Sequence, residues 1–256
     1  MPTPGAYAER CLALDLGTST VRLWTPATGT AITAPTVLAR LEGDRFVAGH
    51  AALASPADSL ASPADGSSVT WPVRGGVVRD FFACVQMLRL LVADLGLPSD
   101  PTLRVLAGVP ATATPRQRTM LVAAARQGVG GRVTAVEEPL AAALACRPDA
   151  TDTDADLVVV DIGSGRTEIA RIADGSVVAA HHVDETGLVD LIPAIADCVR
   201  RLHRPRGRRH RLLLTGGGAM TPGIAGQLAG LTGRSVTMPA DPSLATLTGL
   251  RLLLTG

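Results

Sequence analysis

The chain has 256 residues, of which 46% are hydrophobic and 18% are charged, and its formal net charge is +1. The hydrophobic share is enough to bury a core, which excludes global disorder, and the balanced charge argues neither for a nucleic-acid partner nor for a membrane. Lysine is absent and all 24 basic residues are arginine, which excludes lysine-dependent phosphate loops and Schiff-base chemistry. At about 100–150 residues per domain, the length predicts two small domains or one large one.

The N-terminal residues show no apolar core of the signal-peptide kind, and no apolar run is long enough to span a membrane. The cysteines lie far apart, without the spacing of a metal site or a disulfide framework. They are Cys11, Cys84, Cys146 and Cys198. These features predict a cytoplasmic protein with reduced thiols.

The first motif in the chain combines an apolar strand, an aspartate and a glycine-containing turn. Its candidate residues are Asp15, Gly17, Thr18, Ser19 and Thr20, and alternating residues then predict a second strand. Glycine and small hydroxyl side chains leave backbone N–H groups accessible, which suits a phosphate. The alternative is an ordinary hairpin in which the aspartate and glycine only make the turn.

From residue 77 onwards the pattern alternates helix and strand. Thr114, Pro115 and Gln117 predict a capped helix start. The predicted elements are a helix over 77–95, a strand over 103–108, a helix over 115–127, a strand over 132–136 and a helix that begins at 137–139. An acidic, non-periodic stretch at 147–156 predicts a boundary between two domains.

The second motif repeats the first, with its aspartate 146 residues further along the chain. An apolar strand again ends at an aspartate, followed by a turn and a second strand. The candidate residues are Asp161, Gly163, Ser164, Gly165, Arg166 and Thr167. Two such hairpins indicate an internal duplication of a whole domain, and together they favour a phosphate site over an ordinary hairpin.

A third glycine-rich element, formed by Gly216, Gly217 and Gly218, lies between an apolar strand and a helix start. It lets the backbone approach a ligand, although such a turn can also serve packing alone. The other elements predicted here are a strand over 176–183, a helix over 187–202, strands over 212–214 and 235–238, and helices over 222–232 and 242–254. The alternation predicts an α/β protein.

In order and spacing these motifs resemble the actin-like ATPases, and most of all the bacterial MreB/Mbl family. The resemblance is carried by residues 13–24, 136–145, 158–172 and 212–224, with shorter matches at 34–37, 72–80 and 108–110. It implies an actin-like ATPase fold with two related domains, 1–150 and 151–240, that flank a nucleotide cleft. The terminal helix, 241–256, is expected to pack back on the first domain.

The resemblance also implies ligands, namely ATP and Mg²⁺. The turns at 17–20 and 163–167 would bind the phosphates, and residues 216–218 would bind the adenosine. Asp15 and Asp161 would face Mg²⁺ through water, because a hard cation prefers oxygen ligands. Glu138, or its neighbour Glu137, would position the attacking water. For this pair the alternative is helix N-terminal capping, where carboxylates are favourable.

Two departures from the family pattern concern the catalytic parts. Arg166 stands where the family has the threonine that acts with the glutamate on the water. An arginine can hold a phosphate through charge-assisted hydrogen bonds, but it cannot accept a hydrogen bond from water. In addition, only residues 183–211 separate the second hairpin from the next strand, where the family has a whole subdomain. The outer subdomain of the second domain is therefore expected to be missing.

The third departure is a basic segment that contains seven arginines between Arg200 and Arg211. One interpretation is a peripheral contact with an anionic membrane, since each charge near such a surface contributes about 1 kcal/mol. The other is a solvated loop after a helix whose C-terminus favours cations.

The predicted function is a shortened cytoskeletal protein of cell-shape and cell-wall morphogenesis, which binds ATP weakly or hydrolyses it in a degenerate way. Its expected partners are copies of itself in a filament and cell-wall morphogenesis proteins, with no specific nucleic acid. One alternative is a non-hydrolysing interaction module with the same fold. A weaker alternative is a sugar kinase of the same superfamily, although no sugar-phosphorylating aspartate motif stands outside the turns already assigned.

Overall fold

The computed structural model describes residues 10–55, 68–96, 100–146, 157–184, 188–202 and 211–256. Apart from the two C-terminal residues, these form two compact units. The first comprises Met1–Val109 and Ala113–Ala135, and the second comprises Pro110–Thr112 and Val136–Leu254. The units reflect packing, so the predicted domain limits at 150 and 240 stay a prediction. The predicted boundary stretch, 147–156, lies outside the described residues.

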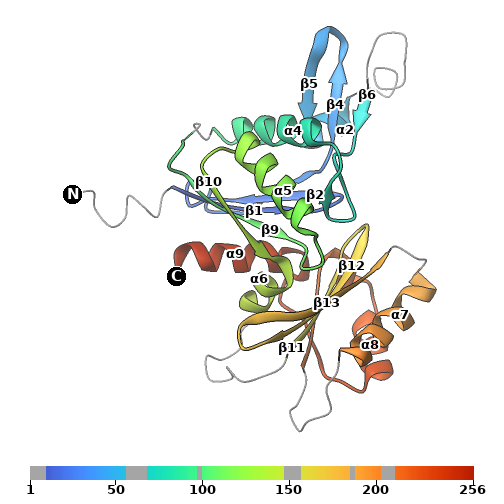
Figure 1. Cartoon of the computed structure of the whole chain (residues 1–256). Coiled ribbons are helices and arrows are strands. Elements are labelled where there is room, and N and C mark those ends of the chain that lie inside the picture. The colour runs from blue at the N-terminus through green and yellow to red at the C-terminus, as the bar shows by residue number, and fades with distance from the viewer. Residues whose placement is uncertain (1–9, 56–67, 97–99, 147–156, 185–187, 203–210) are drawn as a thin grey trace. The chain divides into compact units, whose positions relative to one another are not determined.

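The first unit is built on a five-stranded sheet in the order β10-β9-β1-β2-β3. The strands are β1 (Cys11–Leu16), β2 (Thr20–Trp24), β3 (Ile32–Pro35), β9 (Arg104–Val109) and β10 (Arg132–Glu137). Central β1 is antiparallel to β2 and parallel to β9. Its alternate residues Leu12, Leu14 and Leu16 are buried with apolar residues of α4 (Phe81–Asp94) and α5 (Pro115–Gly128), which lie side by side (Figure 1).

Helix starts in this unit follow local capping. The expected helix over 77–95 begins only at Phe81, because Asp80 caps it by accepting a hydrogen bond from the Ala83 N–H. The preceding residues form β8 (Val77–Val78), which pairs with β7 (Val73–Arg74). The start of α5 is as predicted, with a reciprocal capping box between Thr114 and Gln117.

A small sheet that the sequence analysis did not predict completes the first unit. It joins β4 (Leu38–Leu41), β5 (Arg45–Ala48) and β6 (Ser68–Thr70) in the order β5-β4-β6, with a short turn, η1 (Glu42–Asp44), between β4 and β5. Helix α2 (Gly49–Ala54) contributes Ala52 to a core with Val37 and Ala39. Strands of three or four residues carry too little alternation to be recognised.

The second unit repeats the sheet of the first, in the order β13-β12-β11-β14-β15. The strands are β11 (Leu157–Ile162), β12 (Arg166–Ala173), β13 (Ser176–Asp184), β14 (Arg211–Thr215) and β15 (Val236–Thr237). Central β11 is antiparallel to β12 and parallel to β14, as β1 is to β2 and β9. This common topology confirms the predicted pair of related domains.

Helices cover both faces of the second sheet. Val158, Val160 and Ile162 of β11 face α7 (Leu188–Arg201) and α8 (Ile224–Thr232), whereas Val159 packs with α6 (Glu138–Ala145). Helix α9 (Ala245–Thr255) crosses α6 closely, since a Cβ at Gly249 would lie 1.7 Å from the Ala141 carbonyl oxygen. No described helix is both long and apolar enough to cross a membrane.

The helices of the second unit lie close to their predicted ranges. Between β13 and β14 the described residues form a single helix, α7, in line with the expected loss of the outer subdomain. The predicted helix over 222–232 begins at Ile224, after the 3₁₀ turn η2 (Gly217–Met220). The predicted terminal helix likewise opens with a 3₁₀ turn, η3 (Pro242–Leu244), before α9 begins.

Candidate functional site

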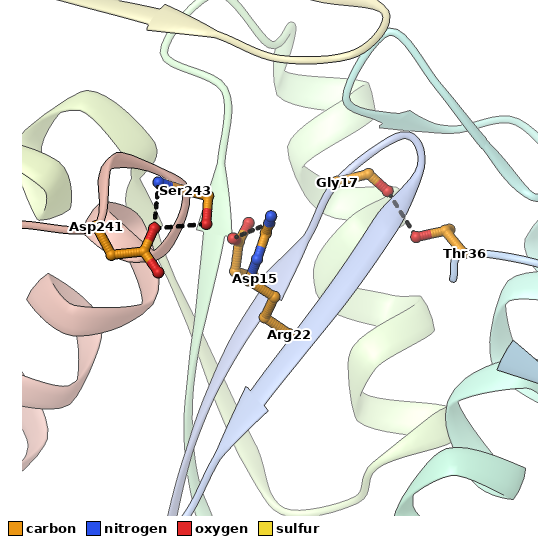
Figure 2. Close-up of polar contacts among 6 residues, drawn as sticks. All are labelled: Asp15, Gly17, Arg22, Thr36, Asp241 and Ser243. Carbon is orange, nitrogen blue, oxygen red and sulfur yellow. Dashed lines mark hydrogen bonds and ion pairs between the residues drawn. The ribbon is translucent and has the colours of Figure 1, made fainter. Parts of the chain in front are cut away.

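The first predicted turn, residues 17–20, connects β1 and β2. The Gly17 N–H donates to the Thr20 carbonyl oxygen at 3.0 Å, and a Cβ at Gly17 would lie 2.9 Å from that oxygen. A second segment holds the turn from outside, since the Thr36 hydroxyl donates to the Gly17 carbonyl oxygen at 2.9 Å (Figure 2). The Thr36 N–H also donates to the Ser19 carbonyl oxygen, at 3.0 Å. The turn therefore has a fixed backbone, while the Ser19 side chain is exposed.

The hydroxyl of Thr18 is also engaged in this turn. It accepts a hydrogen bond of 2.9 Å from the backbone N–H of Gly76, which follows β7. A residue predicted to contact phosphate thus already helps to hold two segments of the first unit together.

Asp15 ends up beside a cation that the sequence analysis did not single out. Asp15 and Arg22 are directly opposite in the β1–β2 pair, and Arg22 Nη1 donates to Asp15 Oδ2 at 3.1 Å (Figure 2). Their side chains are only 10% and 16% exposed, respectively. Burial raises the pKa of Asp15, and the nearby Arg22 guanidinium opposes that rise. The pair is a buried charge with its own counter-ion.

Within the second predicted turn, residues 163–167, the segment 163–166 has the backbone of the first turn. The Gly163 N–H donates to the Arg166 carbonyl oxygen at 3.0 Å, and a Cβ at Gly163 would lie 3.0 Å from that oxygen. Gly163 and Ser164 are exposed, and Gly165 is half-buried. Asp161 occupies the place that Asp15 has in the first hairpin, but its cross-strand partner is a carboxylate, Glu168.

Glu168 is a buried residue that the sequence analysis missed. Its carboxylate accepts hydrogen bonds from the backbone N–H groups of Ala111 and Thr112, both at 2.8 Å, and from the Thr112 hydroxyl at 2.6 Å. Only 4% of the residue is exposed, so these bonds replace water around the charge. The two partners are more than 50 residues away in sequence, and no local pattern points to them.

Arg166 is connected to this cluster through Thr112. The Thr112 hydroxyl gives its only proton to Glu168, and its oxygen accepts a hydrogen bond from Arg166 Nη1 at 3.2 Å. The Nε of Arg166 is buried and has no hydrogen-bond partner among the described residues. The next residue, Thr167, is 2% exposed and follows the strand alternation, so it does not stand in for Arg166 at this turn.

The third glycine-rich element packs directly against the second turn. Gly216 has φ +86°, and a Cβ there would lie 2.2 Å from Asp161 Oδ1 and 2.4 Å from the Ile162 carbonyl oxygen. A Cβ at Gly218 would lie 2.3 Å from Ile162 Cγ2, whereas one at Gly217 would meet nothing within 4 Å. The structure thus brings together two motifs that are more than 50 residues apart in the sequence.

The position of Gly216 is fixed by the start of the terminal helix. Its N–H donates to the Pro242 carbonyl oxygen at 2.9 Å. Pro242 is held in turn by Asp241, whose carboxylate accepts hydrogen bonds from the Ser243 N–H at 2.9 Å and the Ser243 hydroxyl at 2.7 Å (Figure 2). Gly216 therefore has no room for a side chain, and its backbone is held in place by a hydrogen bond.

The carboxylate pair lies where β10 passes into α6. Glu137 is the N-cap residue of α6 but its side chain makes no capping hydrogen bond, and Glu138 lies in the first turn. Both residues are half-buried. Simple side-chain capping therefore does not explain Glu137, and the role of the pair in positioning water stays a prediction.

Two further predictions concern cations and the basic segment. Within the described ranges, no group of three or more His, Cys, Asp or Glu side chains is arranged to hold a metal ion. In the basic segment, Arg200 pairs with Asp197 and donates to the Leu231 carbonyl at 2.9 Å, and Arg201 contacts the Cys198 sulfur at 3.0 Å. Arg211 opens β14, and residues 203–210 lie outside the described part of the chain.

Two sheets of one topology, each with an Asp–Gly turn after its central strand, define an actin-like α/β protein. Solved structures agree: MreB5 of Spiroplasma citri bound to ADP has a TM-score of 0.78 at 17% identity, covering 95% of each chain. The MamK double helical filament has a TM-score of 0.72 at 16% identity, covering 96% of this chain and 99% of that one. At these identities the likeness establishes the fold.

The family follows from the sequence comparisons. The family model for MreB/Mbl protein matches residues 9–204, and the chain belongs to this family. It is 33% identical over 178 residues to the cell shape-determining protein MreB of Escherichia coli K12, covering 67% of this chain and 50% of that protein. With Mbl of Bacillus subtilis the identity is 29% over 182 residues, covering 70% and 53%. The chain thus spans about half the length of these curated relatives.

Proposed function

We propose that the chain is a cytoskeletal protein of cell-shape and cell-wall morphogenesis that binds ATP in the cytoplasm. The observation that carries the proposal is the pair of turns at 17–20 and 163–166. Each turn follows an aspartate, and each is closed by its own backbone hydrogen bond of the same kind. Such turns present N–H groups to an anion in a fixed geometry. Membership of the MreB/Mbl family supports the same conclusion.

The residues present fit a nucleotide. Gly216 and Gly218 keep side-chain atoms away from the β11 end, and the orphaned Nε of Arg166 is a donor for an anion at the second turn. In the proposal the two turns bind the phosphates and residues 216–218 bind the adenosine. Related structures of MreB5 were determined with ADP and AMPPNP.

The metal is a separate part of the proposal. Bound Mg²⁺ would neutralise charge on the phosphates, and Asp161 is the residue proposed to contact it through water. Asp15 was predicted to do the same, but its carboxylate already accepts a hydrogen bond from Arg22.

Hydrolysis is proposed to be slow. Glu138, or Glu137, would orient the attacking water, but the hydroxyl acceptor that would help it is replaced by Arg166. The test is single-turnover phosphate release at equal nucleotide occupancy. Arg166→Thr should raise the rate, and Arg171→Thr, the same change on the same strand, should leave it unaltered. A brisk wild-type rate that falls in Arg166→Thr would make Arg166 catalytic.

Nucleotide binding itself is tested by equilibrium titration with a fluorescent ATP analogue. Arg166→Ala should weaken binding by about tenfold, the effect of one interaction with a charged group. The exposed Arg251→Ala is the matched control and should bind like wild type. A wild-type chain that binds no nucleotide at millimolar concentration would remove the proposal.

A second candidate is a non-hydrolysing interaction module with the same fold. It is favoured by Arg166 and by the described residues between β13 and β14, which form one helix where the family has a subdomain. The proposed partners are further copies of the chain, as in the MamK filament, and cell-wall morphogenesis proteins. Sedimentation with and without ATP tests self-assembly, and co-sedimentation with anionic vesicles tests the membrane contact of the segment from Arg200 to Arg211.

A further inference from the structure

The two turns differ in the charge that faces their aspartates. Asp15 has Arg22 as its cross-strand neighbour, and the equivalent neighbour of Asp161 is Glu168. Glu168 is occupied by the Ala111 and Thr112 donors, so it adds no open ligand to Asp161. The first turn therefore contains a built-in cation at the position where its duplicate has a carboxylate.

Arg22 competes with any metal for the Asp15 carboxylate. The ion pair spans 3.1 Å between side chains that are at most 16% exposed, so its attraction is weakly screened by solvent. A metal held through water needs a carboxylate with net negative charge and free lone pairs to accept the hydrogen bonds of the water shell. Arg22 neutralises that charge and occupies one of the two oxygens.

Arg166 places a second cation at the other turn. Thr112 holds one end of its guanidinium, and the Nε stays buried without a partner. An unpaired buried donor is costly unless a ligand accepts from it, and a phosphate oxygen is a suitable acceptor. Each turn thus has an arginine within its own unit, at a position fixed by other residues.

We infer that Arg22 and Arg166 supply the positive charge that a divalent metal would otherwise supply, so that the chain binds nucleoside triphosphate with little dependence on divalent cations. This inference rests on the proposed nucleotide binding and deepens it. Arg22 acts by neutralising Asp15, and Arg166 acts by direct contact with the phosphates. If Arg22 neutralises Asp15, the nucleotide stays bound without metal. If Asp15 instead holds Mg²⁺ through water, as the sequence predicts, binding is lost when the metal is removed.

The experiment titrates the whole chain with a fluorescent ATP analogue, once with Mg²⁺ and once with excess EDTA. In wild type the two dissociation constants should agree within about threefold. In Arg22→Gln, binding in EDTA should weaken by about tenfold and Mg²⁺ should restore it, because Asp15 is then available to the metal. Arg22→Lys keeps the charge and should lie closer to wild type than Arg22→Gln does. Arg251→Gln, on the exposed face of α9, is the control and should behave like wild type.

Each outcome separates the inference from the proposed function. Wild-type binding that is lost in EDTA and regained with Mg²⁺ would overturn the inference while nucleotide binding stands. Failure to bind under both conditions would instead remove the proposed function. If circular dichroism shows that Arg22→Gln does not fold, the inference is tested by the titrations of wild type and of Arg166→Thr. Arg166→Thr should then bind more weakly in EDTA than with Mg²⁺. If the ratio of its two dissociation constants is unchanged from wild type, the inference is contradicted.

Discussion

Gly17 and Gly163 each donate a backbone hydrogen bond of 3.0 Å to the residue three positions later, Thr20 in the first hairpin and Arg166 in the second. Both glycines are required by the same close approach to that carbonyl oxygen. The side chains around these turns differ in charge, with Arg22 opposite Asp15 and Glu168 opposite Asp161. The duplicated backbone therefore fixes the turn, while the cross-strand residue determines the electrostatics of each copy.

The largest expected effect on stability comes from removing Glu168. Glu168→Ala leaves two backbone N–H groups and a hydroxyl without their acceptor, and should lower the free energy of unfolding by about 4 kcal/mol. Urea unfolding measures this change. Glu42→Ala, which removes an exposed carboxylate, should cost no more than about 0.5 kcal/mol. Equal effects of the two substitutions would show that the cluster around Glu168 does not stabilise the fold.

The glycine loop at 216–218, which packs against the second hairpin, offers a matched pair of substitutions. Gly216→Ala should destabilise by about 3 kcal/mol, because its φ is +86° and the added Cβ would lie 2.2 Å from Asp161 Oδ1. Gly217→Ala, one residue along, would meet nothing within 4 Å and should change stability little. Thermal and urea unfolding of both variants measure the difference. A Gly217→Ala variant as unstable as Gly216→Ala would contradict the packing described here.

In the first hairpin the corresponding test compares the stability of wild type and Arg22→Gln at different pH values. Arg22→Gln should cost about 2 kcal/mol near neutral pH, because a buried carboxylate loses its charged donor. Burial already raises the pKa of Asp15, so folding favours its neutral form and stability is lost as pH rises through the folded-state pKa. Without Arg22 that pKa rises further.

The loss of stability between about pH 5 and about pH 8 should therefore be greater in Arg22→Gln than in wild type. Urea unfolding at the two pH values measures it. The double variant Asp15→Asn with Arg22→Gln has no titrating group at this position and should lose the additional pH dependence. If the single and double variants show the same pH profile, Asp15 is not the group responsible.

The smallest effects concern the threonines that hold each turn from a distant segment. Thr36→Val removes the hydroxyl that donates to the Gly17 carbonyl, and should cost about 1 kcal/mol, whereas Thr36→Ser keeps that hydrogen bond. Thr112→Val removes the hydroxyl that Arg166 and Glu168 share and should cost more, about 1.5 kcal/mol, again restored by serine. Chemical denaturation of the four variants provides the comparison.

Local features of the fold could be predicted from the sequence. The Asp–Gly turns, the capping box at Thr114 and the repeated strand pattern depend on residues close together in the chain. The pairing of Asp15 with Arg22 was missed, although counting outward across a four-residue turn places the two residues opposite one another. Contacts of Glu168 with Ala111 and Thr112 depend on tertiary packing and leave no local signal. The predicted arrangement of the two hairpins across a cleft stays a prediction.

The central claim, that both duplicated turns bind one nucleotide, is tested most directly by hydrogen exchange of the backbone amides with and without AMPPNP. The claim predicts slower exchange at residues 17–20 and at residues 163–166 when the nucleotide is present, because N–H groups that face phosphate oxygens exchange more slowly than those that face water. Amides in the middle of α5 serve as the internal control and should not change. Slower exchange at one turn alone, or at neither, would contradict the account.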